Sequence, residues 1–180
     1  KNNLNKKENY YPLRVNYCSN CHHLQLSHSV SAKSMFDKYL YLTNTSKQNR
    51  DHFRDYALDL ENRVKKKKKI KILDIASNDG TFLKFFSKKK FNKLGIDPAK
   101  NLKIYAKRKN IEQLALYFNY NNSKFIKSNY GTFDIISANH VCAHVDNLSN
   151  FIKGVKNLLK FDGIFAFEVS YLLDVIKKKT

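Results

Sequence analysis

The stretch Ile70–Phe86, IKILDIASNDGTFLKFF, decides the fold class of this chain. An apolar run that ends near Asp74 leads into a turn, after which apolar residues recur at helical spacing. A turn that cradles the pyrophosphate of a dinucleotide reads G-x-G-x-x-G, because its backbone must approach the phosphates closely. Here residues 76–80 read ASNDG, with one glycine. The stretch therefore predicts a strand, a turn and a helix that bind a ligand other than a dinucleotide.

The same alternation of strands and helices continues to the end of the chain. The pattern predicts strands at 70–75, 92–97, 111–116, 133–138 and 163–169, helices at 80–89, 99–108 and 147–160, a helix or loop at 121–128, and a last apolar segment at 171–176. Several of the strands are continuous apolar runs, as in sheets that are covered on both faces. We therefore predict an α/β fold with a mostly parallel sheet and helices on both faces.

Ligands of such sheets bind at the carboxyl ends of the strands. The prediction places four loops at this edge, 76–80, 97–101, 139–146 and 168–171. Asp74 and Asp97 come at the ends of consecutive strands, and a carboxylate in the position of Asp97 can accept hydrogen bonds from both hydroxyls of a ribose. The alternative is that Asp97 and Pro98 only cap the next helix.

S-adenosylmethionine suits such a turn, because it carries no phosphate and needs hydrogen bonds to its ribose and amino-acid end. We therefore predict that this cofactor binds at the carboxyl edge. The predicted cofactor-binding residues are Asp74, Ala76, Ser77, Asn78, Gly80, Asp97, Pro98, Asn139 and His140.

The composition limits the classes of protein to consider. The formal net charge is +19, but the lysines spread along the chain and gather in Lys65–Lys69, Lys88–Lys90 and Lys177–Lys179, with few arginines and no interleaved aromatic residues. This pattern favours a lysine-rich solvated surface over nucleic-acid binding. The three cysteines are an odd number, and no apolar run is long enough for a membrane span. A cytoplasmic protein is the expected class.

The N-terminal quarter has a different character. The polar residues 1–9 predict a disordered end, and YYPLRVNYCSNCHHLQLSHSV predicts a strand, a turn and a strand around Cys18 and Cys21. Thr45 or Ser46 can cap a helix that carries Phe53, Ala57, Leu60 and Val64 on one face. We predict an N-terminal segment at 1–45 and a Rossmann-like domain at 46–180.

The motifs together resemble a known family. The stretches DIASNDGT, LGIDPAKNL and AHVDNL, with the N-terminal C-x-x-C, are similar to the class I methyltransferases that carry a small zinc-binding domain and methylate carbon on nucleotide-linked sugars. The similarity covers most of residues 11–176. It implies S-adenosylmethionine as cofactor, a nucleotide-sugar as substrate, and zinc bound through Cys18 and Cys21. It implies no membrane partner and leaves the oligomeric state, the sugar and its methylated carbon open.

The chain departs from this family in two places. The family has two C-x-x-C pairs, whereas this chain has one, and a tetrahedral structural zinc needs four ligands. His22, His23 and His28 are alternative ligands, but the more economical interpretation is that the sequence starts after the first pair. The family also continues into a catalytic segment rich in Tyr and His, so we expect an internal fragment, or a truncated form, of a longer enzyme.

The resemblance also implies two catalytic residues. Methylation at carbon requires removal of a proton beside a keto group and stabilisation of the enolate. His144 in AHVD corresponds to the substrate-side histidine of the family, and Tyr39 in DKYLY lies in the segment that closes over the cofactor. Cys142 has no base at a suitable spacing and is expected to pack. Two other functions stay open, an RNA-directed methyltransferase and a catalytically incomplete module that binds S-adenosylmethionine or zinc.

Overall fold

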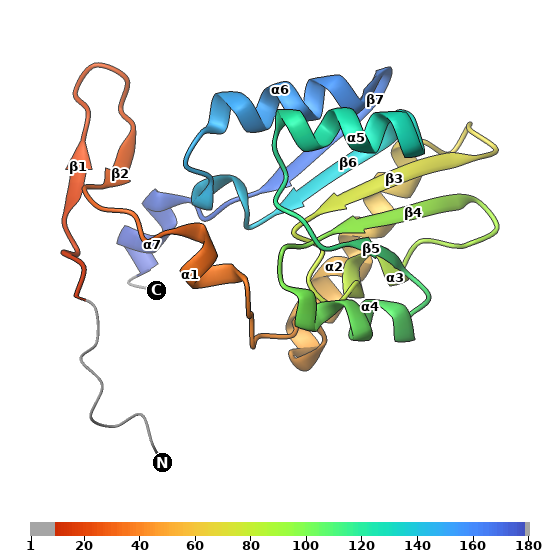
Figure 1. Ribbon diagram of the computed structural model, residues 1–180, viewed down its shortest axis with the longest axis horizontal. Helices are drawn as coiled ribbons and strands as arrows, with labels where there is room; N and C mark the ends of the chain where they lie inside the picture. The colour runs from red at the N-terminus through yellow and green to blue at the C-terminus, as the bar shows by residue number, and fades with distance from the viewer. Residues whose placement is uncertain (1–9, 179–180) are drawn as a thin grey trace.

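A five-stranded parallel sheet forms the centre of the protein. The computed structural model describes residues 10–178, so the expectation for residues 1–9 lies outside it. The strands are β3 (Ile70–Ile75), β4 (Phe91–Ile96), β5 (Glu112–Leu114), β6 (Phe133–Asn139) and β7 (Leu159–Glu168). They are ordered β5-β4-β3-β6-β7, and every pair is parallel (Figure 1). The predicted α/β fold is confirmed.

Helices cover both faces of this sheet, as the apolar runs predict. One layer holds α2 (Lys47–Arg63), α3 (Thr81–Lys84) and α4 (Lys103–Arg108), and the other holds α5 (Tyr120–Tyr130) and α6 (Leu148–Leu158) (Figure 1). Alternate residues of β3 enter the two layers, with Ile72 in the core below α2 and Leu73 in the core below α6. Burial on both sides explains why β3 is apolar except for Lys71 and Asp74.

Helix α2 forms as its cap and apolar face predict. The Ser46 hydroxyl accepts a hydrogen bond from the backbone N–H of Asn49 at 3.3 Å, which satisfies one free donor of the first turn. Phe53, Ala57 and Leu60 are buried against the sheet, and Val64 follows the helix end.

Several predicted boundaries are wrong. The helix predicted at 80–89 is the four-residue α3, because Phe85 and Phe86 already donate to the carbonyls three residues earlier and the lysines beyond them turn in solvent. The strand predicted at 163–169 begins at Leu159, directly after α6, and the strand predicted at 111–116 shortens to β5. The helix predicted from 99 begins as a 3₁₀ turn, Lys100–Leu102. The last apolar segment is helix α7 (Leu172–Lys178).

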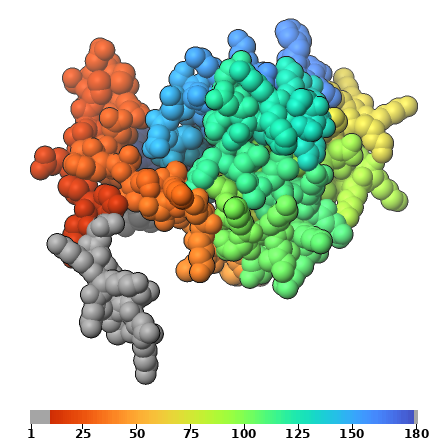
Figure 2. All heavy atoms as spheres, viewed as in Figure 1, coloured from red at the N-terminus to blue at the C-terminus, as the bar shows by residue number. Residues whose placement is uncertain are grey.

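The N-terminal segment lies beside the carboxyl edge of the sheet. Strands β1 (Val15–Tyr17) and β2 (Leu24–Leu26) pair in an antiparallel hairpin, followed by α1 (Ala32–Phe36) and the 3₁₀ turn η1 (Thr43–Thr45). The arrows of the sheet point towards α1, and the hairpin projects as a separate lobe (Figures 1 and 2). No helix within residues 10–178 is long and apolar enough to cross a membrane.

Candidate functional site

The turn after β3 replaces glycine by other residues in the left-handed conformation. Ala76, Asn78 and Gly80 have φ of 59°, 48° and 74°. Asparagine tolerates this conformation well, whereas alanine adopts it at a cost of about 1 kcal/mol. The turn therefore contains three residues with positive φ although only one of them is a glycine. A Cβ on Gly80 would lie 3.2 Å from the Ile111 side chain, so this glycine serves packing.

Contacts from β4 and β5 hold the turn in place. Ser77 lies over Gly95, where an added Cβ would approach the Ser77 hydroxyl to 2.4 Å. The Gln113 amide donates to the Ser77 hydroxyl at 2.8 Å and to the Asn78 carbonyl at 2.7 Å. The Ser77 side chain is thus already engaged within the protein, and a cofactor would meet this residue mainly through its backbone.

Two buried carboxyl groups lie at neighbouring strand ends. The Asp97 oxygens accept backbone N–H bonds from Asn78 and Ala99, each at 2.9 Å, while the Asp74 carboxyl accepts from the Ser137 hydroxyl at 2.7 Å. Burial raises the pKa of Asp97, and burial together with the nearby Asp97 charge raises the pKa of Asp74 to about 7. Asp97 therefore does cap the following turn. Each of its oxygens still has a second lone pair for a ligand.

Residues 37–45, which we call the strap, run across the top of this turn. The Tyr39 N–H donates to the Asn101 side-chain oxygen at 3.2 Å, and the Asn101 amide donates back to the Tyr39 carbonyl at 2.7 Å. The Asn78 side chain makes the same kind of double contact, accepting from Thr43 N–H at 3.1 Å and donating to the Tyr41 carbonyl at 3.0 Å. The strap is therefore fixed to the loops that follow β3 and β4.

A cavity of about 600 Å³ lies between the strap and the carboxyl edge of the sheet. This volume is in the range of small-molecule sites. Its lining includes all but one of the predicted catalytic and cofactor-binding residues, namely Tyr39, Asp74, Ala76, Ser77, Asn78, Asp97, Pro98, Asn139, His140 and His144. Gly80 is the exception. The cavity thus brings together predicted residues from positions 39 to 144 of the chain. Their roles stay predictions.

The two predicted catalytic residues share an aromatic wall of the cavity. The ring of Phe36 lies 6.0 Å from His144, edge-on, and 6.1 Å from Tyr39. The His144 backbone N–H closes a turn onto the Val141 carbonyl. Cys142, beside it, is partly buried against the core under α6, and burial raises the pKa of its thiol. The packing expected for Cys142 is therefore observed.

Two further cavity residues, His52 and Glu168, are not among the site residues predicted from the sequence. The His52 Nε2 lies 2.9 Å from one Glu168 carboxylate oxygen, and the His140 Nε2 lies 3.3 Å from the other. Glu168 is the last residue of β7, so its position at a strand end was a usable signal. His52 gave none, because it sits on α2 beside the buried face and is 116 residues from its partner.

One buried polar atom in the cavity wall lacks a hydrogen-bond partner among the described residues. The side-chain oxygen of Asn139, at the end of β6, accepts no hydrogen bond from any residue within 10–178. A buried acceptor without a partner costs free energy, so this atom is suited to accept a hydrogen bond from a ligand.

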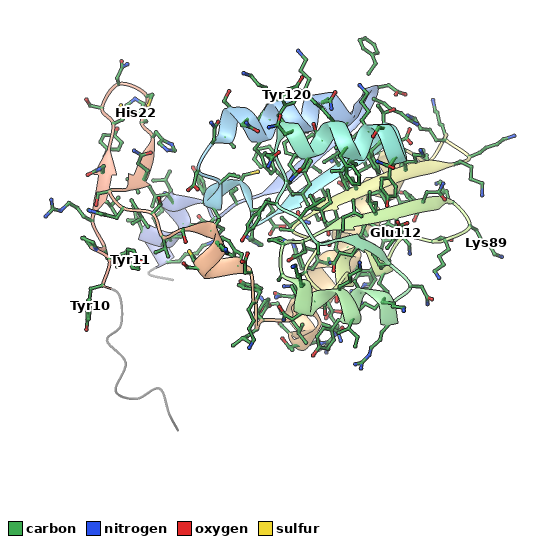
Figure 3. The ribbon with its side chains drawn as sticks, viewed as in Figure 1. Tyr10, Tyr11, His22, Lys89, Glu112 and Tyr120 are labelled. Carbon is green, nitrogen blue, oxygen red and sulfur yellow. The ribbon has the colours of Figure 1, made fainter. Side chains whose placement is uncertain are left out.

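The cysteine pair lies away from the cavity, at the tip of the hairpin. Cys18 and Cys21 are exposed, and the pKa of the Cys18 thiol is lowered, first by the Cys21 backbone N–H. His22, labelled in Figure 3, is hydrogen-bonded to the Tyr17 hydroxyl. Within residues 10–178, no three His, Cys, Asp or Glu side chains are placed to hold a metal ion together. Two thiolates are half of the four ligands that a structural zinc needs.

The parallel sheet, the acid after its second strand and the cavity at its carboxyl edge are those of a Rossmann-like class I methyltransferase. The family described as "Methyltransferase domain" matches residues 47–178, and one described as "Putative zinc binding domain" matches residues 1–36. The chain belongs to the methyltransferase domain family.

The individual relatives agree with this family. A C-methyltransferase, NovU of Streptomyces niveus, is 26% identical over 170 residues, which are 94% of this chain and 40% of NovU. The chain thus spans less than half the length of this relative. The plantazolicin methyltransferase BpumL, solved with a desmethyl-plantazolicin analog and SAH, has a TM-score of 0.57 at 17% identity and covers 75% of this chain and 52% of its own. The PH0226 protein of Pyrococcus horikoshii OT3 has a TM-score of 0.57 at 22% identity, and the match covers 77% of this chain and 66% of PH0226. Both likenesses establish the fold.

Proposed function

We propose that this chain is the cofactor-binding part of an S-adenosylmethionine-dependent methyltransferase that transfers a methyl group to a carbon of a nucleotide-linked keto sugar. Membership of the methyltransferase family supports the reaction class, and the similarity to NovU, a C-methyltransferase, supports carbon as the acceptor. The presence of SAH in the BpumL structure supports the cofactor.

The observation that carries the proposal is the pairing of a glycine-poor turn with Asp97. The turn offers hydrogen bonds but no phosphate nest. Asp97 lines the same cavity, and each of its oxygens keeps a lone pair with which it can accept a hydrogen bond from a ribose hydroxyl. The free acceptor of Asn139, two strands away, is suited to the ammonium group of an amino-acid end. These donors and acceptors fit S-adenosylmethionine, which supplies an electrophilic methyl group when bound.

His144 and Tyr39 are proposed to act on the sugar side of the cavity. An imidazole at position 144 can donate a hydrogen bond to the oxygen of a keto group and stabilise the charge that develops there. Tyr39 belongs to the strap, and its fixed backbone allows its phenol ring to cover a bound ligand and exclude water.

The position of two of the three lysine runs argues against an RNA substrate. Lys65–Lys69 and Lys88–Lys90 precede β3 and β4, so both runs lie at the amino ends of the strands. Lys89 is labelled in Figure 3 at the end of the sheet opposite the hairpin. A polyanion bound to these runs would be held away from the cavity, which favours a small-molecule substrate.

For zinc, we propose that Cys18 and Cys21 provide two thiolates of a structural site whose other ligands lie outside the described residues. Such a site would fix the hairpin and leave the chemistry of the cavity unchanged.

Calorimetric titration tests the cofactor directly. We expect S-adenosylhomocysteine to bind with a stoichiometry of one and NAD to bind at least tenfold more weakly. Tighter binding of NAD would refute the proposal for the cavity. Methyl transfer from S-adenosylmethionine to members of a panel of nucleoside-diphosphate keto-hexoses, followed by mass spectrometry of the sugar, tests the substrate class separately.

A further inference from the structure

Two asparagine side chains hold the backbone of the strap. The Asn101 side chain accepts a hydrogen bond from the Tyr39 N–H at 3.2 Å and donates one to the Tyr39 carbonyl at 2.7 Å. The Asn78 side chain accepts from the Thr43 N–H at 3.1 Å and donates to the Tyr41 carbonyl at 3.0 Å. A side-chain amide carries both the acceptor and the donor that such a double contact needs. We call these two contacts the asparagine clasps.

Little apolar packing supports the strap. None of residues 37–45 is buried, and only Leu42 and Thr43 among them are half-buried. Helix α1, which precedes the strap, and the turn η1 within it also bury no residue. A surface segment that is held mainly by hydrogen bonds opens locally at a small cost in free energy. The position of the strap therefore depends on its polar contacts.

Hydrogen bonds also attach both ends of the strap. The Tyr117 hydroxyl donates to the Asp37 carboxylate at 2.6 Å, and the Asn44 N–H donates to the Asp79 carboxylate at 3.2 Å. Together with the asparagine clasps, these bonds connect the strap to the loops that follow β3, β4 and β5. Tyr39 and other strap residues line the cavity, so a ligand bound there lies between the strap and the edge of the sheet.

Position 78 is held in its turn by the backbone. Its N–H donates to the Asp97 carboxylate at 2.9 Å, and its carbonyl accepts from the Gln113 amide at 2.7 Å. Of the contacts of the Asn78 side chain, the bond that the Asp79 N–H donates at 2.8 Å lies within the turn, and the other two go to the strap. A substitution here can therefore remove the strap contacts while the backbone bonds of the turn remain.

We propose that Asn78 and Asn101 are positioning residues, which hold the strap and its Tyr39 against a bound cofactor. Asn101 acts through the strap alone, because it lies outside the cavity lining and, among the described residues, its side chain bonds only to the Tyr39 backbone. The cofactor enters and leaves when the asparagine clasps open. The role of Tyr39 in turnover rests on the proposed function, whereas cofactor release does not depend on the substrate.

This role also explains why position 78 is not a glycine. A glycine tolerates the positive φ of this position, but it has no side chain with which to hold the strap. Asparagine meets both requirements, since it tolerates the left-handed conformation and presents an amide to the backbone of Tyr41 and Thr43. The turn after β3 is thereby linked directly to the segment that carries Tyr39.

Release of S-adenosylhomocysteine tests the asparagine clasps without a methyl acceptor. Its dissociation rate is measured by chasing labelled ligand with an excess of unlabelled ligand. Asn101→Ala and Asn78→Gly should each raise this rate by roughly tenfold, which is the scale of two lost hydrogen bonds. An unchanged rate in both variants would overturn the proposal.

Asn110→Gly is the matched control for Asn78→Gly. Asn110 also has a positive φ, 57°, and it is exposed and lies outside the cavity lining. The control should release S-adenosylhomocysteine at the rate of the unmodified protein, and melting temperatures should show that all three variants are folded in the assay. A rise of equal size in Asn110→Gly would assign the effect to the added glycine and overturn the role of Asn78.

Hydrogen exchange of the strap amides gives a second readout. The amides of Tyr39 and Thr43 each donate to an asparagine side chain and should be protected in the complex with S-adenosylhomocysteine. Asn101→Ala should speed exchange at Tyr39 and Asn78→Gly at Thr43, each by roughly tenfold, while the amides of β3 keep their protection. Faster release and exchange in Asn78→Gly alone would show that this residue acts through its turn and would overturn the shared role.

The link to Tyr39 is tested by the single-turnover rate of methyl transfer to a sugar of the panel. Asn101→Ala should lower this rate by roughly tenfold, the scale of two hydrogen bonds that no longer position the strap. In a Tyr39→Ala background the same substitution should change the rate by less than about twofold, because the ring that Asn101 positions is gone. Equal losses in the two backgrounds would overturn this link.

The outcomes separate the two proposals. If the unmodified protein binds S-adenosylhomocysteine but methylates no sugar of the panel, the proposed substrate class fails, and the link from Asn101 to turnover fails with it. The release and exchange measurements still decide whether the asparagine clasps hold the strap, because neither needs a methyl acceptor.

Discussion

Removal of the Asp97 carboxylate should affect both ligand binding and folding. In Asp97→Ala the ribose loses a charged acceptor, and the backbone N–H groups of Asn78 and Ala99 lose the partners that they have at 2.9 Å. The prediction therefore has two magnitudes, one for affinity and one for stability.

The affinity change follows from hydrogen bonds to a charged group. Such bonds contribute about 1.5–3 kcal/mol, so the dissociation constant for S-adenosylhomocysteine should rise by roughly 10- to 150-fold. The stability change follows from two donors left without partners, each costing about 1–3 kcal/mol. Because burial raises the pKa of Asp97, the substitution also removes a cost of burying its charge, and we expect a net loss of about 2 kcal/mol.

Asp134→Ala provides the matched control. Asp134 is equally buried near the start of β6, where it accepts from the backbone N–H of Lys71 and the ammonium groups of Lys67 and Lys160, at the opposite end of the sheet from the cavity. Urea unfolding should show that both variants are destabilised, and calorimetry at a temperature where both stay folded should show lost affinity for Asp97→Ala alone. Equal affinities in the two variants would mean that Asp97 only caps its turn.

Three further perturbations have defined outcomes. Asp74→Asn tests the pH dependence of stability. The folded-state pKa of Asp74 is about 7, above the unfolded value near 3.9, so its contribution to stability is fully present below about pH 4 and declines as the pH rises to 7. Relative to the unmodified protein, the variant should therefore be more stable at pH 8 than at pH 5, by about 3 kcal/mol in the free energy of unfolding. A variant that follows the unmodified protein at both pH values would contradict the raised pKa. His144→Asn should lower turnover by about 10²-fold and leave S-adenosylhomocysteine affinity within about twofold, whereas a sharp fall in melting temperature with normal turnover per folded enzyme would assign His144 to packing. Residues 1–180 alone should hold less than one equivalent of zinc after dialysis, and Cys18→Ser with Cys21→Ser should abolish what remains; one tightly held zinc per chain would point to histidine ligands.

The parts of the site that the sequence predicts correctly are local in the chain. The turn after β3 and the acid after β4 each follow an apolar strand directly, and in a parallel sheet those ends must meet at one edge. The pairing of Leu73 with Leu94 and of Asp74 with Gly95 places them side by side. No information beyond strand order was needed to bring Asp74 and Asp97 together.

The parts that escaped prediction depend on tertiary contacts. The length of α3 depends on how soon the chain must return to the amino edge of the sheet to begin β4. The helical spacing of apolar residues gives no information about this distance. The cluster of His52, His140 and Glu168 depends on how α2 packs beside the end of β7. A histidine beside the buried face of a helix is indistinguishable, in the sequence alone, from one in solvent.

The order of the strands accounts for the arrangement of the whole site. The groups that follow successive strands form a row, with Asp97 after β4, Asp74 near the end of β3, Asn139 at the end of β6 and Glu168 at the end of β7. A ligand that spans this row meets acceptors for hydroxyls first, then the amide oxygen of Asn139, and finally the Glu168 carboxylate, which lies 2.9 Å from His52 and 3.3 Å from His140. At roughly 4.8 Å per strand, Asp97 and Glu168 are thereby about 14 Å apart along this edge. Because this separation is fixed by interstrand hydrogen bonds, a nucleoside held at Asp97 would leave the Glu168 end of the edge for the methyl acceptor.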